Sequence, residues 1–306
     1  MPKELKFLFC GLANAGKTSI LRTLDNDFEK IPLLTPTVGV NYNTFKVMGF
    51  TIAVWDLGGQ LKYRKKYLLE NDRYFQETSA LFYVIDVQDV EQQKESLSYL
   101  ESIRDALASL QQEDVSFTIM LHKFDPHVRG KENNIEKEVA KIKERVDKIL
   151  ASYTHMFFET TIYEPPSIFR AFSQTLLNYV PQAEIIWGKI EEIARDFSSP
   201  MAILLDSGGY IYGQWHSSEA QLMDLAKFTR IAQEFARLAA QQTSSEFTLL
   251  SMNDAANIAV ITFPVGVEIF MFCLLVPRTW LEQDAAMQDQ LISRHKELAK
   301  VLQVFE

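Results

Sequence analysis

The chain has 306 residues, with 31 Lys and Arg against 40 Asp and Glu, so its formal net charge at pH 7 is -9. This acidic balance gives no overall electrostatic attraction for nucleic acid, and we expect no nucleic-acid partner. A chain of this length exceeds the usual size of one domain, so two domains are expected. The two cysteines, Cys10 and Cys273, favour buried thiols in a reducing compartment over a disulfide.

No segment of the sequence is typical of a direct membrane anchor. The longest apolar run, residues 263–277, contains Glu268 and is shorter than the roughly 20 residues that a membrane-spanning helix needs. We find no N-terminal secretory pattern, no Gly at position 2 for myristoylation and no C-terminal prenylation box. The sequence therefore predicts a cytoplasmic protein that would reach a membrane surface only through a partner.

The first 180 residues alternate between strand-like and helical patterns. Apolar runs predict strands, and apolar residues at intervals of four and three predict a helix over residues 135–149. The predicted strands are 5–10, 43–48, 51–56, 80–86 and 116–122. This alternation predicts an α/β domain over residues 1–182, with a mostly parallel, doubly wound sheet. In such a sheet, ligands bind at the carboxyl ends of the strands.

The pattern changes after residue 182. A helix is predicted over residues 183–197, followed by two strands, a helix, three strands and a last helix. The predicted strands are 201–206, 210–215, 247–253, 257–263 and 267–276, and the two later helices are 222–238 and 279–304. This order is typical of a small α+β domain, which together with a linker helix would occupy residues 183–306.

The octet GLANAGKT, residues 11–18, fits the pattern G-x-x-x-x-G-K-[ST] between a predicted strand and a predicted helix. In that place the backbone N–H groups of a loop can point at phosphate oxygens, and the helix N-terminus adds partial positive charge. Lys17 is then expected to reach the β- and γ-phosphates of a nucleotide, and the Thr18 hydroxyl to bind Mg²⁺. The alternative is an ordinary glycine turn with a surface lysine. The other residues expected at the phosphates are Gly11, Asn14, Ala15, Gly16 and Ser19.

The segment WDLGGQ adds a second group of candidates. Asp56 ends a predicted strand, where its carboxylate can hold Mg²⁺ through water, although a helix cap or a strand-end turn would also explain it. The Gly59 amide could sense a γ-phosphate, and Gln60 could orient an attacking water. Together with the octet, this segment indicates that a nucleoside triphosphate is bound and hydrolysed.

A threonine is expected to close over the metal and the γ-phosphate. Thr37, in the segment PTVG, is the candidate for this catalytic and metal-binding role. Thr35 competes with it, and a plain loop threonine is the alternative for both. We favour Thr37 because PTVG leads directly into the predicted hairpin.

The segment LHKFDP indicates the base. Asp125 can accept hydrogen bonds from the N1–H and 2-amino groups of guanine, a pair of donors that adenine lacks. His122 and Lys123 belong to the same motif, and the Lys123 stem would lie over the purine ring. After the next strand-like run, Thr161 and Ile162 are candidates for the guanine O6, with the Thr161 backbone N–H as the donor. A charged loop in solvent is the alternative.

These elements, in this order, resemble the small GTPases of the Ras superfamily. PTVG and WDLGGQ look like the Arf branch, whereas HKFD, with His122 where most small GTPases have Asn, looks like the Rag branch. Residues 70–89, residues 160–182 and the ending VLQVFE resemble Rag proteins most closely. The mixture of Arf-like and Rag-like features in a compact chain favours an archaeal or otherwise early-branching relative.

The resemblance implies a P-loop GTPase domain followed by a C-terminal roadblock-type domain, and a switch that binds GTP or GDP with Mg²⁺. It further implies a homo- or heterodimer formed through the C-terminal domain, a roadblock-type scaffold, an exchange factor and a GTPase-activating protein. Two alternatives are a pseudo-GTPase that serves as a dimerisation scaffold and an ATP-using P-loop enzyme. The C-terminal domain could also form a sensor pocket instead of a dimerisation surface.

Two departures bear on the rate of hydrolysis. Ala13 occupies the loop position where a side chain can crowd Gln60, and the segment between Thr18 and Thr37 is too short for an inserted helical domain that would supply an arginine. Because an arginine finger can raise the rate by roughly 10³–10⁵, both features predict slow hydrolysis and an activator in trans. A basic cluster after Gln60 is expected either to be solvated or to contact partners: Arg64, Lys65 and Lys66.

Overall fold

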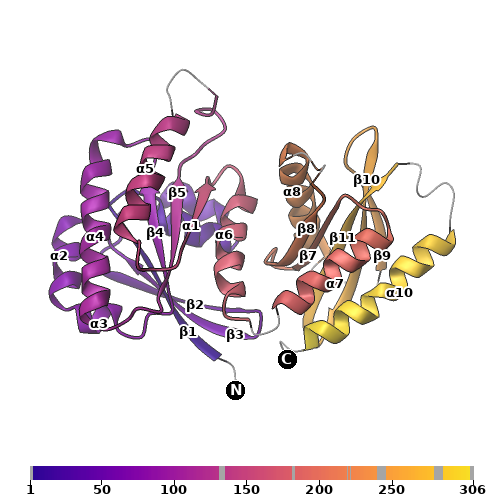
Figure 1. Ribbon diagram of the computed structural model, residues 1–306, viewed down its shortest axis with the longest axis horizontal. Helices are drawn as coiled ribbons and strands as arrows, with labels where there is room; N and C mark the ends of the chain where they lie inside the picture. Colours follow the sequence, from indigo (N-terminus) through magenta and orange to yellow (C-terminus); the bar gives the residue numbers. More distant parts are fainter. Residues whose placement is uncertain are drawn as a thin grey trace. The chain divides into compact units, whose positions relative to one another are not determined.

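The computed structural model describes residues 3–130, 135–180, 183–218, 220, 222–239, 246–278 and 285–303. The chain divides into two compact units, Met1–Ala171 and Phe172–Glu306 (Figure 1). Each unit is built on its own sheet, with six strands in the first and five in the second.

The division between the units lies within helix α6 (Pro165–Leu177), upstream of the predicted boundary after residue 182. The Phe172 ring packs against Tyr210, with the ring centres 5.7 Å apart. The Ile211 N–H donates a hydrogen bond to Ser173 Oγ at 2.9 Å. The C-terminal part of α6 therefore packs with the second unit, because it is bonded to a hairpin of that unit.

The sheet of the first unit has the strand order β2-β3-β1-β4-β5-β6. Its strands are β1 (Lys3–Gly11), β2 (Val40–Val47), β3 (Phe50–Leu57), β4 (Ala80–Asp86), β5 (Ser116–His122) and β6 (His155–Thr160). β1 is parallel to β3 and β4, β4 to β5 and β5 to β6, whereas the edge strand β2 is antiparallel to β3. The carboxyl ends of five strands therefore meet at one edge. The predicted α/β class with a mostly parallel, doubly wound sheet is confirmed.

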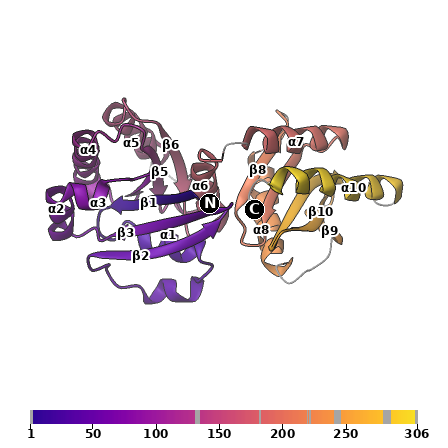
Figure 2. The ribbon, with the colours of Figure 1, turned by 90° about the horizontal axis from the view of Figure 1, so that it is seen from below.

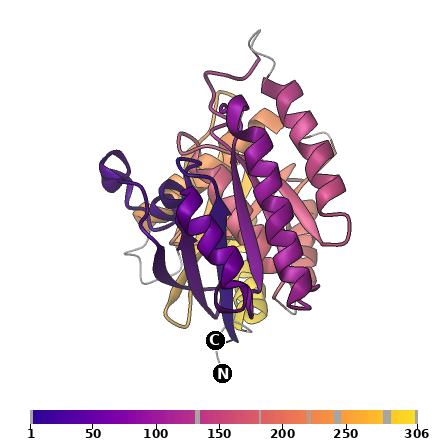
Figure 3. The ribbon, with the colours of Figure 1, turned by 90° about the vertical axis from the view of Figure 1, so that its left-hand side faces the viewer.

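Helices cover both faces of this sheet, with α2 to α5 on one face and α1 and α6 on the other (Figure 1). Figure 3 looks onto the first face. Leu8 and Cys10 of β1 join the apolar core beneath α4 and α5, whereas Phe9 stacks on Phe82, with ring centres 4.5 Å apart. Burial on both faces explains the continuous apolar runs of these strands. The helices are α1 (Lys17–Leu24), η1 (Phe28–Leu33), α2 (Leu61–Leu69), α3 (Asn71–Phe75), η2 (Val90–Gln92), α4 (Gln93–Ser109) and α5 (Ile135–Ile149).

The second unit has an antiparallel sheet with the strand order β8-β7-β11-β10-β9. Helices α7 and α10 lie on one face of it and α8 on the other (Figure 2). Its elements are α7 (Ala183–Asp196), β7 (Met201–Asp206), β8 (Ile211–His216), α8 (Leu222–Ala239), β9 (Glu246–Ser251), β10 (Ala256–Val265), β11 (Glu268–Pro277) and α10 (Ala285–Leu302). This order is the predicted one, although residues 279–284 of the last predicted helix lie outside the described residues. Among the described helices of either unit, none is long and apolar enough to cross a membrane.

Asp206 is a buried carboxyl group at the end of β7. Its Oδ1 accepts a hydrogen bond from the Tyr210 N–H at 3.0 Å. Burial raises the pKa of Asp206 to about 7, because the bond from Tyr210 offsets the lost hydration only in part and Glu268 adds negative charge nearby. Ionisation of Asp206 therefore lowers the stability of the second unit.

The pH dependence of the free energy of unfolding tests whether ionised Asp206 lowers the stability of the second unit. Since the folded-state pKa of Asp206 lies above its unfolded value, its stabilising contribution is present below about pH 4 and lost as the pH rises to about 7. Asp206→Asn keeps an oxygen acceptor for Tyr210 and removes the charge. The free energy of unfolding at pH 8 should therefore rise by on the order of 2 kcal/mol, with little change at pH 4. Urea unfolding, followed by fluorescence in a Trp55→Phe background, measures the second unit.

The matched control is Asp254→Asn, the same change at an exposed carboxylate of the same unit. It should leave the free energy of unfolding unchanged at both pH values. Equal effects of the two substitutions would show that burial of Asp206 is not the cause.

Candidate functional site

The loop between β1 and α1 ends in a left-handed turn at Gly16. Asn14 and Gly16 have positive φ angles of 61° and 98°, and a Cβ atom at Gly16 would overlap the His122 ring, so glycine is required there. The backbone N–H groups of Gly16, Lys17 and Thr18 donate no hydrogen bond to any other residue in the described part of the chain. Unpartnered amides at a helix N-terminus are suited to phosphate oxygens.

The Lys17 side chain is buried beneath this loop. Its Nζ donates hydrogen bonds to the Gly11 carbonyl at 3.1 Å and to the Leu12 carbonyl at 2.7 Å. Burial lowers the pKa of Lys17 to about 8, and the negative charge of Asp56 opposes this shift only in part. The buried ammonium group has carbonyl oxygens for partners, so an anionic ligand at the loop would stabilise its charge.

Three oxygen-bearing side chains meet beside the loop. Thr18 Oγ1 donates a hydrogen bond to Asp56 Oδ2 at 2.6 Å, and Thr37 Oγ1 lies 2.9 Å from Thr18 Oγ1 and 3.3 Å from Asp56 Oδ2. Asp56 is fully buried, and its Oδ1 has no hydrogen-bond partner among the described residues. Of the two threonines that the sequence leaves open, Thr35 and Thr37, it is Thr37 that reaches this group. Hydroxyl and carboxylate oxygens are the donors that Mg²⁺ prefers, so the residues present fit that ion.

A cavity of about 210 Å³ adjoins these groups. Gln60, which precedes α2, lines it together with Ala13, so the two side chains of the predicted hydrolysis step face the same space. A Cβ atom at Gly59 would overlap the backbone of Leu12 and Ala13, so this turn packs directly on the loop. The cavity is lined by Ala13, Asn14, Gly16, Lys17, Thr18, Ser19, Leu34, Thr35, Pro36, Thr37, Gly59 and Gln60.

Two of the residues predicted to contact the phosphates, Gly11 and Ala15, pack against the neighbouring backbone. Gly11 ends β1 with a φ of 140°, and a Cβ atom there would overlap the Val84 backbone. Ala15 is buried, and its N–H donates to the Leu12 carbonyl at 3.4 Å. Both residues shape the loop by close packing, so at these two positions small size matters more than side-chain chemistry.

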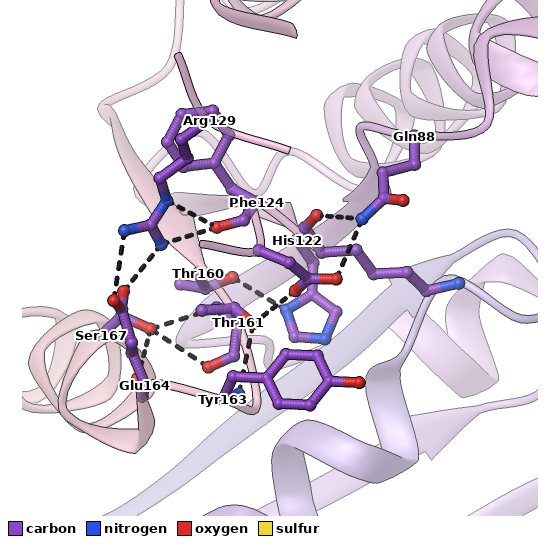
Figure 4. Close-up of polar contacts among 11 residues, drawn as sticks. Gln88, His122, Phe124, Arg129, Thr160, Thr161, Tyr163, Glu164 and Ser167 are labelled. Carbon is purple, nitrogen blue, oxygen red and sulfur yellow. Dashed lines mark hydrogen bonds and ion pairs between the residues drawn. The ribbon is translucent and has the colours of Figure 1, made fainter. Parts of the chain in front are cut away.

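The candidates for base recognition lie together beyond β5 and β6 (Figure 4). Asp125 is buried, and its Oδ1 accepts a hydrogen bond from Thr161 Oγ1 at 2.5 Å. The Thr161 N–H donates to Ser167 Oγ at 3.1 Å, whereas the Ile162 N–H donates to no other described residue. The Thr161 amide, the predicted donor to guanine O6, is therefore already bonded. Ile162 is the better candidate for that contact, and the Thr161 hydroxyl orients Asp125 instead.

His122 lies between the phosphate loop and β6. Its Nδ1 is 3.0 Å from Thr160 Oγ1, and its ring packs against Gly16. Burial lowers the pKa of His122 to about 4, with a smaller contribution from the neighbouring positive charge of Lys123. The imidazole is neutral at physiological pH, so it acts as a packed hydrogen-bonding group that joins the phosphate and base regions.

Sequence motifs do not reveal the contacts that hold the base loops together. Arg129 donates to the Phe124 carbonyl from Nε at 3.0 Å and pairs with Glu164 at 2.7 Å, which ties the loop after β5 to the loop after β6 (Figure 4). Lys123 Nζ pairs with Asp86 at 2.6 Å. These partners are distant in sequence, so only the parallel strand order could have pointed to them.

The position of Arg64 differs from the one predicted for the basic cluster. It is buried, its Nε donates to the Gly59 carbonyl at 2.9 Å, and its guanidinium group pairs with Glu95 of α4. The prediction that Arg64 is solvated or contacts partners is therefore wrong, because its side chain links the glycine turn to a neighbouring helix. Lys65 and Lys66 are exposed.

The strand order and the loop after β1 define an α/β domain of the small GTPase type. A sequence model of the Gtr1/RagA G protein conserved region matches residues 6–235, from β1 into α8. Because the match covers most of the chain, the chain belongs to the Gtr1/RagA family of G proteins. The predicted resemblance to Rag-like and Arf-like small GTPases is confirmed, whereas the roadblock type of the second unit and an archaeal origin stay predictions.

Individual relatives match the chain over shorter stretches. The chain is 42% identical over 93 residues to ADP-ribosylation factor-like protein 3 of Chlamydomonas reinhardtii and 38% identical over 87 residues to ADP-ribosylation factor-like protein 2 of Drosophila melanogaster. These stretches cover 30% and 28% of this chain, and 49% and 44% of those proteins, so the chain spans slightly less than half the length of these relatives. The solved structure of the Arl6 BBS3 small GTPase from Trypanosoma brucei with bound nucleotide analogue GppNp matches with a TM-score of 0.43 and 22% identity, covering 57% of this chain and 96% of that one.

The bonds of Arg64 lead to a local prediction. Arg64→Ala removes the donor to Gly59 and the partner of Glu95, so α2 should open more often. Amide exchange of residues 61–69, measured by hydrogen–deuterium exchange, should become about ten-fold faster, which corresponds to roughly 1.4 kcal/mol. Lys65→Ala, a change on the exposed side of the same helix, should leave the exchange rate unaltered. Equal rates in the two variants would contradict an anchoring role of Arg64.

Proposed function

We propose that this chain is a guanine-nucleotide switch that binds GTP or GDP with Mg²⁺ and hydrolyses GTP slowly. The observation that carries the proposal is the meeting of the Thr18, Thr37 and Asp56 oxygens beside loop amides that donate to no residue in the described part of the chain. The buried Asp56 Oδ1, which has no hydrogen-bond partner within the described ranges, supplies an acceptor at the same place. A single carboxylate with two hydroxyl groups suits Mg²⁺ that takes its other ligands from phosphate and water.

Different residues of the site would bind the phosphates and position the attacking water. The loop amides and Lys17 Nζ would bind the β- and γ-phosphates, with Lys17 exchanging its bonds to loop carbonyls for bonds to phosphate oxygens. Bound Mg²⁺ would neutralise charge on the phosphates. The Gln60 side-chain amide would accept a hydrogen bond from a water and hold it in line with the γ-phosphorus.

The lining of the cavity supports slow hydrolysis. Ala13 shares the space of Gln60, and no arginine is found among the described residues that line the cavity. An arginine near the γ-phosphate contributes roughly 10³–10⁵ in rate where one is present. We therefore expect a GTPase-activating protein that acts in trans and an exchange factor that releases GDP.

Contacts of Gly39 support a conformational switch. The Gly39 carbonyl accepts hydrogen bonds from the Gly58 N–H at 2.9 Å and from the Tyr67 hydroxyl at 2.7 Å. These bonds tie the segment that carries Thr37 to the glycine turn and to α2. Loss of the γ-phosphate would release Thr37 and change these segments together, which is how a partner would distinguish GTP from GDP.

The second unit would serve as the dimerisation domain. Its five-stranded sheet with α7, α8 and α10 is compatible with a roadblock-like domain, and the family match extends into α8. We propose a homo- or heterodimer through this unit, docked on a roadblock-type scaffold that recruits the switch to a membrane surface from the cytoplasm. The main rival is a pseudo-GTPase scaffold, against which the complete set of Lys17, Thr37 and Gln60 around the cavity argues.

Base choice provides the first functional prediction. Asp125→Asn replaces one acceptor oxygen by an amide donor, which no longer matches guanine but matches the reversed requirement of xanthine. Equilibrium binding should show a loss of GTP affinity of about 100-fold or more and a gain for xanthosine triphosphate. Asp114→Asn, at an exposed site of the same unit, is the control and should bind GTP normally. An unchanged preference in Asp125→Asn would instead support an ATP-using enzyme.

Turnover provides the second functional prediction. Unaided hydrolysis of GTP by the native chain should be slower than about one per second, the low end of ordinary enzymes. Gln60→Leu should slow a single turnover at least about ten-fold while leaving GTP affinity nearly unchanged, because Gln60 acts on the attacking water and not on the nucleotide. Identical turnover in the native and variant chains would favour the pseudo-GTPase scaffold.

A further inference from the structure

Gln88 follows β4 and contacts the base-recognition residues, although the sequence motifs assign it no role in base recognition (Figure 4). Its Nε2 donates hydrogen bonds to Asp125 Oδ2 at 2.9 Å and to the Lys123 carbonyl at 2.7 Å. Because both partners are acceptors, the amide orientation of Gln88 is defined, and its NH₂ group faces the carboxylate.

Asp86 fixes the backbone that carries Gln88. Its Oδ1 accepts a hydrogen bond from the Gln88 N–H at 3.0 Å, and its Oδ2 pairs with Lys123 Nζ at 2.6 Å. Gln88 is therefore held at its backbone by Asp86 and at its side chain by the loop after β5. This double attachment links the end of β4 directly to that loop.

The Asp125 carboxylate is braced from both sides. Thr161 donates to one oxygen and Gln88 to the other, from the loops after β6 and β4, which flank the loop after β5 in the sheet order. A carboxylate offers about four acceptor sites, so the two braces leave about two for a ligand. Guanine presents two donors on one edge, N1–H and the 2-amino group.

We infer that Gln88 is a positioning residue for guanine selectivity, which holds Asp125 so that both carboxylate oxygens accept hydrogen bonds from the base. The inference rests on the proposed function and names a determinant of its substrate choice. Without the brace the carboxylate can turn about its Cβ–Cγ bond. It would then still meet one donor, but it would lose the fixed geometry that two donors require.

Inosine diphosphate tests the contact with the 2-amino group by itself. Its base, hypoxanthine, keeps the N1–H donor of guanine and lacks the 2-amino group. Binding of GDP and of inosine diphosphate to the full chain with Mg²⁺, measured by calorimetry, avoids interference from hydrolysis. Gln88→Met keeps the side-chain length and removes the donor. GDP affinity should fall roughly ten-fold and inosine diphosphate affinity about two-fold, so the ratio of the two should fall about five-fold.

Gln88→Glu distinguishes the effect of losing the hydrogen bond to Asp125 from the effect of changing the side-chain shape. Glu has nearly the same shape, but its carboxylate cannot donate and repels Asp125, so the ratio should fall further than in Gln88→Met. Gln92→Met is the matched control, since Gln92 lies in the same segment and its side chain bonds to Asp89 and not to Asp125. In Gln92→Met, the ratio of GDP affinity to inosine diphosphate affinity should equal that of the native chain.

Two outcomes would overturn the inference. Equal losses for both nucleotides would assign Gln88 a general structural role, and a gain in GDP affinity would show that it competes with the base for Asp125. Failure of the proposed function looks different, because the native chain would then bind ADP as tightly as GDP. Failure of the inference alone would leave the native preference for GDP intact and the ratio in Gln88→Met unchanged.

Discussion

Close backbone approach at two glycines is the constraint on which the rest of the site depends. Gly16 leaves room for the His122 ring, and Gly59 lies against the backbone of Leu12 and Ala13. Each contact joins the loop after β1 to the end of another parallel strand, β5 or β3. A side chain at either glycine would push the loops apart, so the phosphate, water and base contacts that we propose would all depend on this one geometry.

The same geometry buries two charged groups whose neighbours satisfy them only in part. Lys17 is buried with carbonyl partners and a lowered pKa, and Asp56 Oδ1 is buried without a partner among the described residues. Groups that cost stability in this way are concentrated at functional sites, where a ligand supplies what they lack. A phosphate anion with a divalent cation would satisfy both at once, which gives a physical reason for nucleotide and metal to bind together.

The sequence predicts some parts of this structure more closely than others. The continuous apolar runs predict β4 and β5 with the bounds that the structure shows, because both strands are buried on both faces. Local motifs also indicate the residues that the structure brings around the cavity. Pairs such as Arg64 with Glu95, and Gln88 with Asp125, escape prediction because 31 and 37 residues separate the partners and no local pattern links them. Such pairs depend on which loops the strand order makes neighbours.

The identity of the nucleotide that the full chain carries after purification tests most directly whether this site binds guanine nucleotide. Chromatography of the material released on denaturation identifies and quantifies it. We expect close to one guanine nucleotide per chain, mostly GDP after long incubation, because a bound nucleotide would stabilise the buried charges of the site and because we propose that Asp125 selects guanine. An adenine nucleotide, or a folded chain that carries none and binds neither GDP nor GTP when these are added with Mg²⁺, would show that the chain is not a guanine-nucleotide switch.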